Sequence, residues 1–199
     1  MPRDSADTRA RLLAAAREEF TDRGLEGARV DRIAARAGVN KERIYGHFGS
    51  KDRLFEAVIA TTLDEHVAAL GLPTGDPADY VGRIYDFHAT HPELLRLMQW
   101  ESLSYHGQAL PDENRRAVHY AEKVAALART LDTEPGLDPA ATLLTLIGLA
   151  AWPHALPQVT RLILGPDTDS ETAHRVLRDH VVDFARRALH AGTEQRARL

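Results

Sequence analysis

The stretch between residues 31 and 51 restricts the fold more than any other part of this 199-residue chain. Its pattern predicts two short helices, at about residues 30–37 and 41–48, separated by a turn of three residues. Gly38 can end the first helix in a left-handed conformation, and Asn40 can cap the second by accepting a backbone N–H. Helices joined this tightly form a helix-turn-helix, which holds the second helix at a steep angle to the first.

The second of these helices has one buried face and one free face. Ile44 and Phe48 lie one turn apart and are expected to pack inward. The side chains that point away from Ile44 combine charge, an aromatic ring and a bare backbone position: Glu42, Arg43, Tyr45 and Gly46, flanked by Lys41 and His47. Such a surface suits the major groove of DNA, where side chains of this kind read base edges.

The distribution of charge is compatible with DNA binding, although the net charge is −4. Residues 1–65 hold 12 of the 25 basic and 12 of the 29 acidic residues, so the excess acid lies in residues 66–199. Between Arg29 and Arg53, seven basic residues stand against three acidic ones. This segment can therefore supply a compact footprint for phosphates.

Helical periodicity continues through the rest of the chain, and no run alternates apolar and polar residues as a half-buried strand does. We predict an all-α fold of about nine helices. The first is expected over residues 7–23, capped by Ser5 or Asp7 and stopped at Gly24. The last is expected over residues 171–191, behind a cap at Ser170 and ending at Gly192.

The remaining breaks are predicted from local composition. Stretches rich in Gly, Pro or Asp lie at residues 71–77, 106–111, 132–139 and 165–169. Pro153 and Pro157 should kink or interrupt the eighth helix.

Several classes of protein are disfavoured. The chain contains no cysteine, which excludes disulfides, thiolate metal sites and cysteine nucleophiles. The charged start does not look like a signal peptide, and the apolar run at residues 140–152 is too short to cross a bilayer. Ten histidines are present, but no nucleophile motif, phosphate-binding glycine loop or HExxH sequence accompanies them. We therefore expect a cytoplasmic protein that is no enzyme, crosses no membrane and needs no cofactor or metal.

Twelve residues of the predicted head form one specific pattern: Ile33, Ala34, Ala37, Gly38, Val39, Ile44, Tyr45, His47, Phe48, Ser50, Lys51 and Leu54. This pattern resembles the head of the TetR family of bacterial repressors. The resemblance is strong over about residues 8–60, and elsewhere it rests on the number and length of the helices. It implies a DNA-binding head in residues 1–65 and a ligand-binding and dimerisation body in residues 66–199.

The resemblance also implies roles for individual residues. Tyr45 and His47 match positions that contact phosphates or the edge of the groove, and Lys51 matches a phosphate-binding lysine at the start of the fourth helix. The positions that face the bases in that family are matched by Lys41, Glu42, Arg43 and Gly46.

Three residues depart from the family pattern. Asn40 stands where serine is usual, Glu42 where a small residue is usual, and Arg29 where a serine or threonine commonly caps the second helix. Arg29 is expected to reach the DNA backbone instead. Glu42 would be repelled by phosphates unless it accepts a hydrogen bond from cytosine N4 or pairs with Arg43 or Arg36.

Arginines near the start of the chain leave two interpretations open. They can touch phosphate or a minor groove, or they can form an ordinary solvated face. These residues are Arg3, Arg9 and Arg11.

The last two helices are candidates for a homodimer interface, because a reader with one recognition helix per chain gains affinity from a second copy. The eighth helix is apolar almost all round and the ninth carries an apolar stripe. The candidate interface residues are Leu144, Ile147, Leu177, Val181 and Phe184. Ordinary intrachain core is the alternative.

Aromatic residues in the middle of the chain predict a small-molecule pocket, with ordinary core packing as the alternative. The candidate lining residues are Phe87, Met98, Trp100, Glu101, Tyr105, Tyr120 and Trp152. His88 and His91 have the spacing of a metal pair, but a solvated or helix-capping role is favoured.

These observations favour a DNA-binding transcriptional regulator, most simply a repressor that an unknown small molecule releases from a palindromic operator. The fourth helix would then be the lever between ligand and head. A DNA-binding regulator of the same fold that senses no ligand is the alternative, and an enzyme that uses the helical body is disfavoured.

Overall fold

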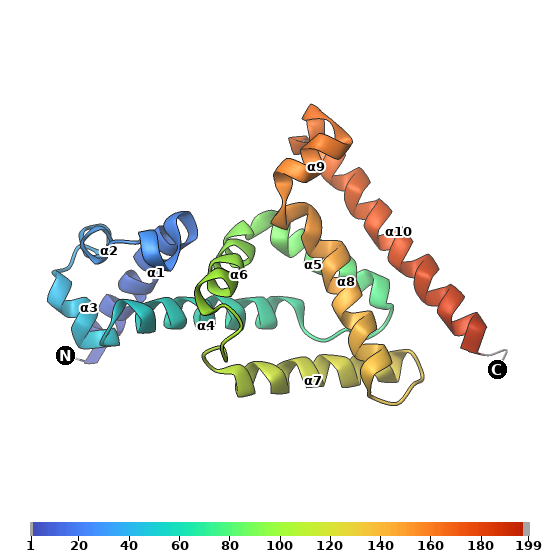
Figure 1. Ribbon diagram of the computed structural model, residues 1–199, viewed down its shortest axis with the longest axis horizontal. Coiled ribbons are helices and arrows are strands. Elements are labelled where there is room, and N and C mark those ends of the chain that lie inside the picture. The colour runs from blue at the N-terminus through green and yellow to red at the C-terminus, as the bar shows by residue number, and fades with distance from the viewer. Residues whose placement is uncertain (1, 197–199) are drawn as a thin grey trace. The chain divides into compact units, whose positions relative to one another are not determined.

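The computed structural model describes the backbone of residues 2–196 and the side chains of residues 5–168 and 170–190. Over this range the chain forms ten α-helices and one short 3₁₀ helix, which confirms the predicted all-α fold (Figure 1). The elements are α1 (Pro2–Gly27), α2 (Val30–Ala37), α3 (Lys41–Phe48), α4 (Lys51–Leu70), α5 (Pro77–Thr90), α6 (Pro92–Tyr105), α7 (Glu113–Thr130), α8 (Leu137–Ala155), α9 (Pro157–Leu164), η1 (Pro166–Asp169) and α10 (Glu171–Arg196).

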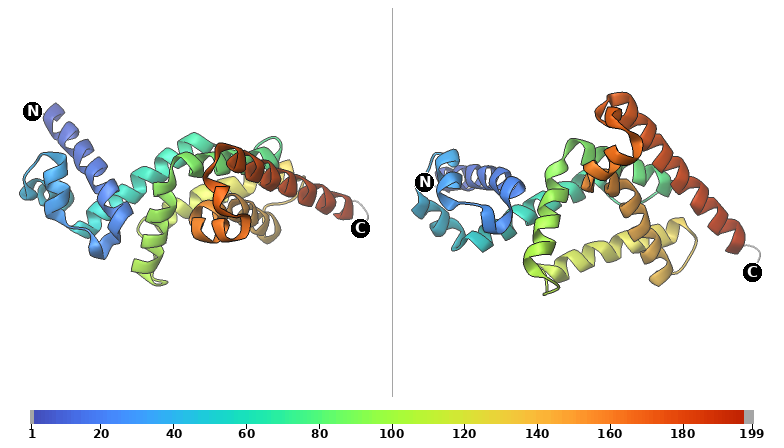
Figure 2. Two further views of the ribbon diagram at one scale, coloured as in Figure 1. Left: turned by 90° about the horizontal axis from the view of Figure 1, so that it is seen from above. Right: turned by 45° about the horizontal axis from the view of Figure 1, so that its top comes forward.

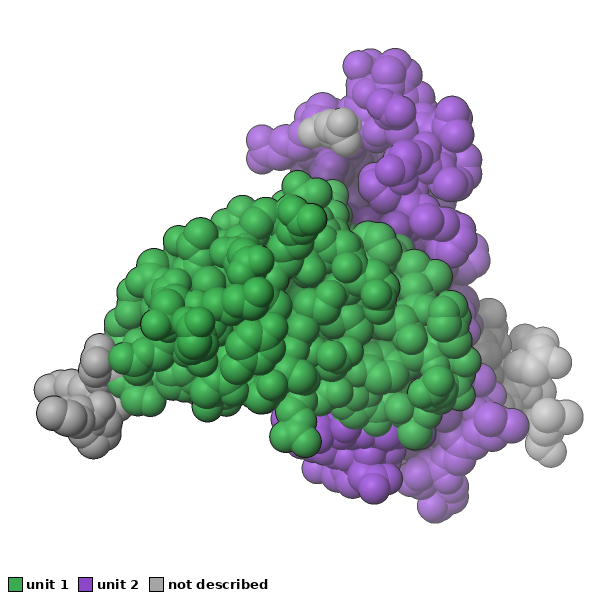
Figure 3. All heavy atoms as spheres, turned by 60° about the vertical axis from the view of Figure 1, so that its left-hand side comes forward, with its two compact units in different colours: residues 1–67, 92–111 green, residues 68–91, 112–199 purple. Residues whose placement is uncertain are grey.

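The contacts divide the chain into two compact units, coloured separately in Figure 3. Unit 1 comprises Met1–Val67 and Pro92–Pro111, and unit 2 comprises Ala68–His91 and Asp112–Leu199. The division predicted from sequence placed everything after residue 65 in the second domain. Residues 92–111 instead lie with the first helices, because α6 packs along α1.

Unit 1 is built around one apolar core to which α1, α2, α3, α4 and α6 all contribute. Figure 2 shows the backbone of these helices in two further views. Leu12, Ala16 and Phe20 of α1 are fully buried, and the Phe20 ring meets the Phe55 ring edge-on at 5.0 Å. Leu13, next to Leu12 in the same helix, is only partly buried and packs against this core.

The ends of α1 differ from the prediction. The helix begins at Pro2, upstream of both Ser5 and Asp7, so neither residue is its N-cap. Gly24 does interrupt the helical backbone, with φ 64° and ψ −177°, and three further residues follow it in the same element. A left-handed φ of this kind favours glycine, which has no Cβ to clash.

The helix-turn-helix forms as predicted. Gly38 ends α2 in a left-handed conformation, with φ 66° and ψ 35°. The Asn40 side chain accepts a hydrogen bond of 3.2 Å from the backbone N–H of Arg43 and so caps α3. Val39, in the turn between α2 and α3, packs against the core of unit 1.

Unit 2 consists of packed helices in which α5 contacts α8 and α10, and α7 contacts α8. The chain bends by 84° between α8 and α9, at Leu156, immediately before Pro157. This break explains why ten helices are present rather than about nine. Ser170 caps α10 as predicted, by accepting a hydrogen bond of 3.2 Å from the Ala173 N–H, but the helix continues past Gly192 to Arg196.

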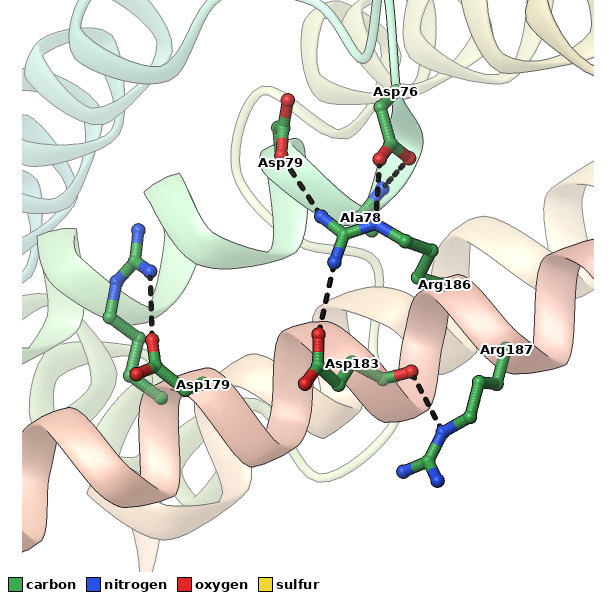
Figure 4. A network of polar contacts seen from close by, with 8 residues as sticks. Asp76, Ala78, Asp79, Asp179, Asp183, Arg186 and Arg187 are labelled. Atoms are coloured by element: carbon green, nitrogen blue, oxygen red, sulfur yellow. Dashed lines mark hydrogen bonds and ion pairs between the residues drawn. The ribbon is translucent and has the colours of Figure 1, made fainter.

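Carboxylates anchor α10 to the start of α5 (Figure 4). The Arg186 guanidinium lies 3.0 Å from both Asp76 and Asp183 and 3.4 Å from Asp79. Arg178 on the same helix pairs with Asp86 at 2.6 Å. In this part of unit 2, each of these partly exposed arginines therefore has at least one carboxylate partner.

Among the described residues, no single helix is long and apolar enough to span a membrane. The bent pair formed by α8 and α9 passes that test only when its two helices are taken together.

Candidate nucleic-acid interface

The buried side of α3 fixes its orientation in unit 1. Ile44 is fully buried and Phe48 is 8% exposed, so the helix is anchored at two positions one turn apart. The Arg9 guanidinium of α1 lies 5.4 Å from the centre of the Phe48 ring, within the range of a cation–π contact. The opposite face of α3 is consequently held toward solvent.

That free face is accessible in the way the sequence predicts. Lys41, Glu42, Arg43, Tyr45 and Gly46 are exposed, and His47 is half-buried. A shallow hollow of about 350 Å³ is lined by Asn40, Glu42, Arg43, Gly46 and His47.

Two features keep the centre of this face open. Within the described part of the chain, neither the Arg43 guanidinium nor the Glu42 carboxylate forms an ion pair or a side-chain hydrogen bond. A Cβ built on Gly46 would meet no atom within 4 Å, so fold packing does not require a glycine there. Glu42, Arg43 and Gly46 are therefore available to contact an external partner.

Neighbouring charges are engaged within the unit. Lys41 pairs with Asp31 of α2 at 3.0 Å, and this pairing raises the pKa of Lys41 through the hydrogen bond and the charge of Asp31. Arg36 pairs with Glu18 at 3.3 Å rather than with Glu42. Glu42 therefore forms neither of the two ion pairs considered for it, the one with Arg43 and the one with Arg36.

The start of α2 is supported by a residue that the sequence did not single out. Glu19 of α1 is 2% exposed; its Oε1 accepts hydrogen bonds of 3.0 Å from the Arg29 backbone N–H and 2.7 Å from Arg32 Nε. Burial raises the pKa of Glu19, but the hydrogen bonds from Arg32 and Arg29 outweigh it, and the net pKa is lowered. The start of α2 thus has no side-chain cap, and a carboxylate of α1 holds the Arg29 backbone and the Arg32 side chain instead.

The remaining basic candidates lie around the same end of unit 1. Arg29 is exposed, and Lys51 is half-buried with its Nζ 3.5 Å from the Ala28 carbonyl oxygen. Arg11 near the start of the chain is engaged within unit 1, because it donates to the Ala37 carbonyl oxygen at 3.2 Å and pairs with Asp7. The side chain of Arg3 lies outside the described side chains.

Four of the predicted pocket residues lie on α6, in unit 1. Trp100 packs against the unit 1 core, and its indole N–H donates to the Thr21 carbonyl oxygen at 3.2 Å. Tyr105 also packs there, with its hydroxyl donating to Glu56 at 3.2 Å. Glu101 is buried and Met98 is half-buried. Trp100 and Tyr105 therefore support the head, and a ligand role for the four residues remains a prediction.

The other three predicted pocket residues lie in unit 2. Phe87 is buried and stacks on His91 at 4.4 Å, whereas Tyr120 is 42% and Trp152 57% exposed. His88 is buried, and among the described residues no group of three or more His, Asp or Glu side chains has a geometry that could hold a metal ion.

The predicted dimerisation residues are arranged on α8 and α10 of unit 2. Leu144 is 72% and Phe184 51% exposed, Ile147 and Leu177 are partly exposed, and Val181 is buried. Trp152 and Val176 add to the exposed apolar surface of the same two helices. Leu143, Leu146 and Ala150 form the intrachain face of α8.

A helix-turn-helix with an accessible second helix, joined to a larger helical unit, defines a class: the helix-turn-helix DNA-binding transcriptional regulators. Comparison with family models specifies it further. Residues 12–58 match the model for bacterial regulatory proteins of the tetR family, and residues 76–187 match the model for the tetracyclin repressor-like C-terminal domain. The chain belongs to the TetR family.

Individual relatives agree with this assignment. The chain is 38% identical to the HTH-type transcriptional repressor SCO4008 of Streptomyces coelicolor, over 93% of this chain and 96% of that protein. The crystal structure of the putative transcriptional regulator SCO4942, also from Streptomyces coelicolor, matches with a TM-score of 0.72 and 30% identity, covering 91% of this chain and 97% of that one. AibR, solved in complex with isovaleryl coenzyme A and operator DNA, shares the fold with a TM-score of 0.60 and 17% identity, over 89% and 97% of the two chains.

Proposed function

We propose that this protein is a homodimeric, cytoplasmic transcriptional repressor that a small molecule releases from a palindromic operator. The observation that carries the proposal is the open face of α3, where Glu42, Arg43 and Gly46 are accessible and engaged by nothing within the described chain. Relatives that are transcriptional repressors support the same function rather than an enzymatic one.

The residues of this face suit distinct contacts with DNA. A free guanidinium such as that of Arg43 can donate two hydrogen bonds to the O6 and N7 acceptors of guanine. Glu42, which forms no ion pair with its neighbours, is suited to accept from cytosine N4. Gly46 leaves room for a base edge to approach the helix backbone.

Phosphate contacts are assigned to the rim of the same face. Tyr45 and His47 flank the free face, and Lys51 begins α4, where the helix N-terminus also attracts anions. Arg29 is exposed at the start of α2. Lys41 can exchange its pairing with Asp31 for a phosphate or a base, since that ion pair is exposed and of low energetic value.

Dimerisation is proposed to cover the apolar surface of α8 and α10. Leu144 and Phe184 are large apolar side chains more than half exposed on a single chain, which is typical of an interface rather than of a monomer surface. Two-fold pairing would present two copies of α3 to half-sites one helical turn apart, or a multiple of it, and this predicts a palindromic operator.

Ligand response is proposed as a shift between two states of the dimer. AibR, which has the same fold, binds isovaleryl coenzyme A as well as operator DNA, and this supports a ligand site in the helical body. The lever would be α4, because it begins in the head and runs to Leu70 without interruption.

The proposal is tested by selecting duplexes from a random library with the full-length protein and then titrating the best site with salt. A palindrome should be enriched, and binding should weaken steeply as salt rises. Arg43→Ala should lose about 1–3 kcal/mol of binding free energy and tolerate substitution of one symmetric base pair. Gly46→Ala should weaken binding through steric conflict with DNA alone, since the added methyl meets nothing within the protein.

Arg129→Ala provides the matched control, because it removes the same charge from an exposed position on α7 of unit 2. It should bind the selected site as the wild type does. Failure to enrich any duplex at low salt would contradict the proposal.

A further inference from the structure

Unit 2 contains a buried lysine without a counter-ion. Lys123 of α7 is 1% exposed, and its Nζ lies 5.7 Å from the centre of the Tyr80 ring and 5.8 Å from that of Tyr120. Within the described part of the chain, no carboxylate pairs with it. Burial alone lowers its pKa, with no opposing contribution from a neighbouring acid.

Tyr80 of α5, against which Lys123 packs, has its own unmet polar group. Its side chain is fully buried, and its hydroxyl has no hydrogen-bond partner among the described residues. The Arg83 guanidinium lies 5.2 Å from the centre of the same ring. Burial raises the pKa of Tyr80 to about 12, so its hydroxyl remains a hydrogen-bond donor at neutral pH. Two cations thus lie near the Tyr80 ring, and the hydroxyl of that ring is a buried donor.

Two other cations of unit 2, Arg178 and Arg186, differ from Lys123 in exposure and in their partners. The side chains of Arg178 and Arg186 are 36% and 37% exposed, and both pair with carboxylates. Figure 4 shows the carboxylates around Arg186. Solvent could stabilise those charges, whereas Lys123 has access to almost none. A buried ammonium without a counter-ion destabilises the folded state. An incoming anion would recover that cost, which is how a buried charge contributes selectivity to a ligand site.

We propose that Lys123 and the Tyr80 hydroxyl bind the carboxylate of a small-molecule effector, with the Tyr80 and Tyr120 rings packing against the apolar remainder. The ammonium supplies the charge and the hydroxyl donates a second hydrogen bond, a combination stronger than one between neutral groups. The inference rests on the ligand response under the proposed function and assigns the chemical class of that ligand. The competing interpretation is a neutral amine that fills space in an apolar core.

The test measures binding of a chain-length series of carboxylates (acetate, butyrate, octanoate) and of benzoate, by calorimetry and thermal unfolding. Primary amides of the same chains are the neutral controls, and inorganic phosphate tests the other common anion. At least one carboxylate should bind the wild-type protein and raise its Tm, while its amide should bind at least tenfold more weakly. Lys123→Met, which keeps the length and apolar character of the side chain, should weaken carboxylate binding at least tenfold.

Lys123→Arg keeps the charge and should retain more of the affinity than Lys123→Met. Tyr80→Phe removes only the hydroxyl and should weaken carboxylate binding severalfold, so it tests the site independently if Lys123→Met does not fold. The proposal is overturned if no carboxylate binds, if amides or phosphate bind better than carboxylates, or if both variants bind as the wild type does.

Operator binding distinguishes this failure from failure of the proposed function. Lys123→Met, without ligand, should bind duplex DNA with wild-type affinity, because Lys123 lies in unit 2. Intact DNA binding without carboxylate binding would contradict only the proposed role of Lys123 as a carboxylate site. Carboxylate binding without any DNA binding would contradict only the proposed repressor function.

Discussion

At the scale of single residues, Glu19 is the clearest case of a side chain whose importance depends on its partners. It is buried and accepts hydrogen bonds from the Arg29 backbone and from Arg32. Glu19→Ala should lower the free energy of unfolding by about 2 kcal/mol, because it leaves these donors without an acceptor. Glu18→Ala on the same helix removes an exposed ion pair with Arg36 and should cost less than about 1 kcal/mol. Urea unfolding measures both, and equal losses would contradict the role of Glu19.

Histidines make the stability of unit 2 depend on pH. Burial lowers the pKa of His88 to about 4, from 6.5, and nearby His154 and His91 act in the same direction. The pKa is lower in the folded state, so the unfolded chain binds more protons below pH 6.5 and stability falls as pH drops toward 4. At about 1.4 kcal/mol per pKa unit, His88 should cost about 2 kcal/mol of stability by pH 5.

This dependence is measured by urea unfolding at pH 7.5 and pH 5. His88→Gln should reduce the difference in stability between the two conditions, while the contribution of His154 remains, since burial lowers its pKa to about 4 as well. A variant with the same pH dependence as the wild type would show that His88 is not the buried neutral group described.

The sequence predicted the roles of those residues that depend on their immediate neighbours. Gly38, Asn40 and Ile44 were predicted correctly because turn geometry, capping and helical period act within four residues. Glu19 was missed because its bond to Arg29 joins residues ten apart across two helices. A buried glutamate on an otherwise apolar face of α1 was the available signal.

At the scale of elements, the contact between α1 and α6 depends on one glycine. Gly24 has φ 64°, and a Cβ placed there would lie 2.6 Å from the Trp100 ring. Gly24→Ala should therefore suffer both backbone strain and a steric clash. Gly71→Ala has nearly the same φ, 62°, but meets no atom within 4 Å, so it isolates the strain.

The two variants are compared by their Tm. Gly24→Ala should lose at least about 1 kcal/mol more stability than Gly71→Ala, because overpacking in a core typically costs about 1–3 kcal/mol. In a Trp100→Ala background, Gly24→Ala should cost less stability than it does in the wild type, because the ring that the new Cβ would meet is gone. Equal losses for both glycines, and the same cost of Gly24→Ala in both backgrounds, would contradict the clash.

Helix positions were largely predictable, whereas the partners of the helices were not. The bounds of α2 and α3 follow from periodicity and turn residues, and Pro157 marks the break before α9. The indole of Trp100 bonds to a carbonyl 79 residues earlier, and nothing in the local pattern reveals that pairing. An aromatic residue at helical spacing therefore indicated a pocket, although Trp100 contacts the core of the head.

At the scale of the whole molecule, dimerisation is expected to depend on the exposed apolar residues of α8 and α10. Leu144→Glu and Phe184→Glu place charges on this surface and should shift the protein from dimer to monomer. Val118→Glu on α7 changes an apolar side chain that is 61% exposed and lies outside these helices, so it should leave the dimer intact. Analytical ultracentrifugation measures all three, and a dimer that survives both charged variants would place the interface elsewhere.

The central claim is that the open face of α3 contacts base edges in two major-groove half-sites. Protection of guanine N7 from dimethyl sulfate, on the selected duplex with wild-type protein and Arg43→Ala, tests this claim most directly. The wild type should protect guanines at two symmetric positions about 10 base pairs apart, or a multiple of that spacing, and Arg43→Ala should lose that protection while still binding at low salt. Unprotected guanines in a saturated complex, or identical protection by the variant, would contradict it.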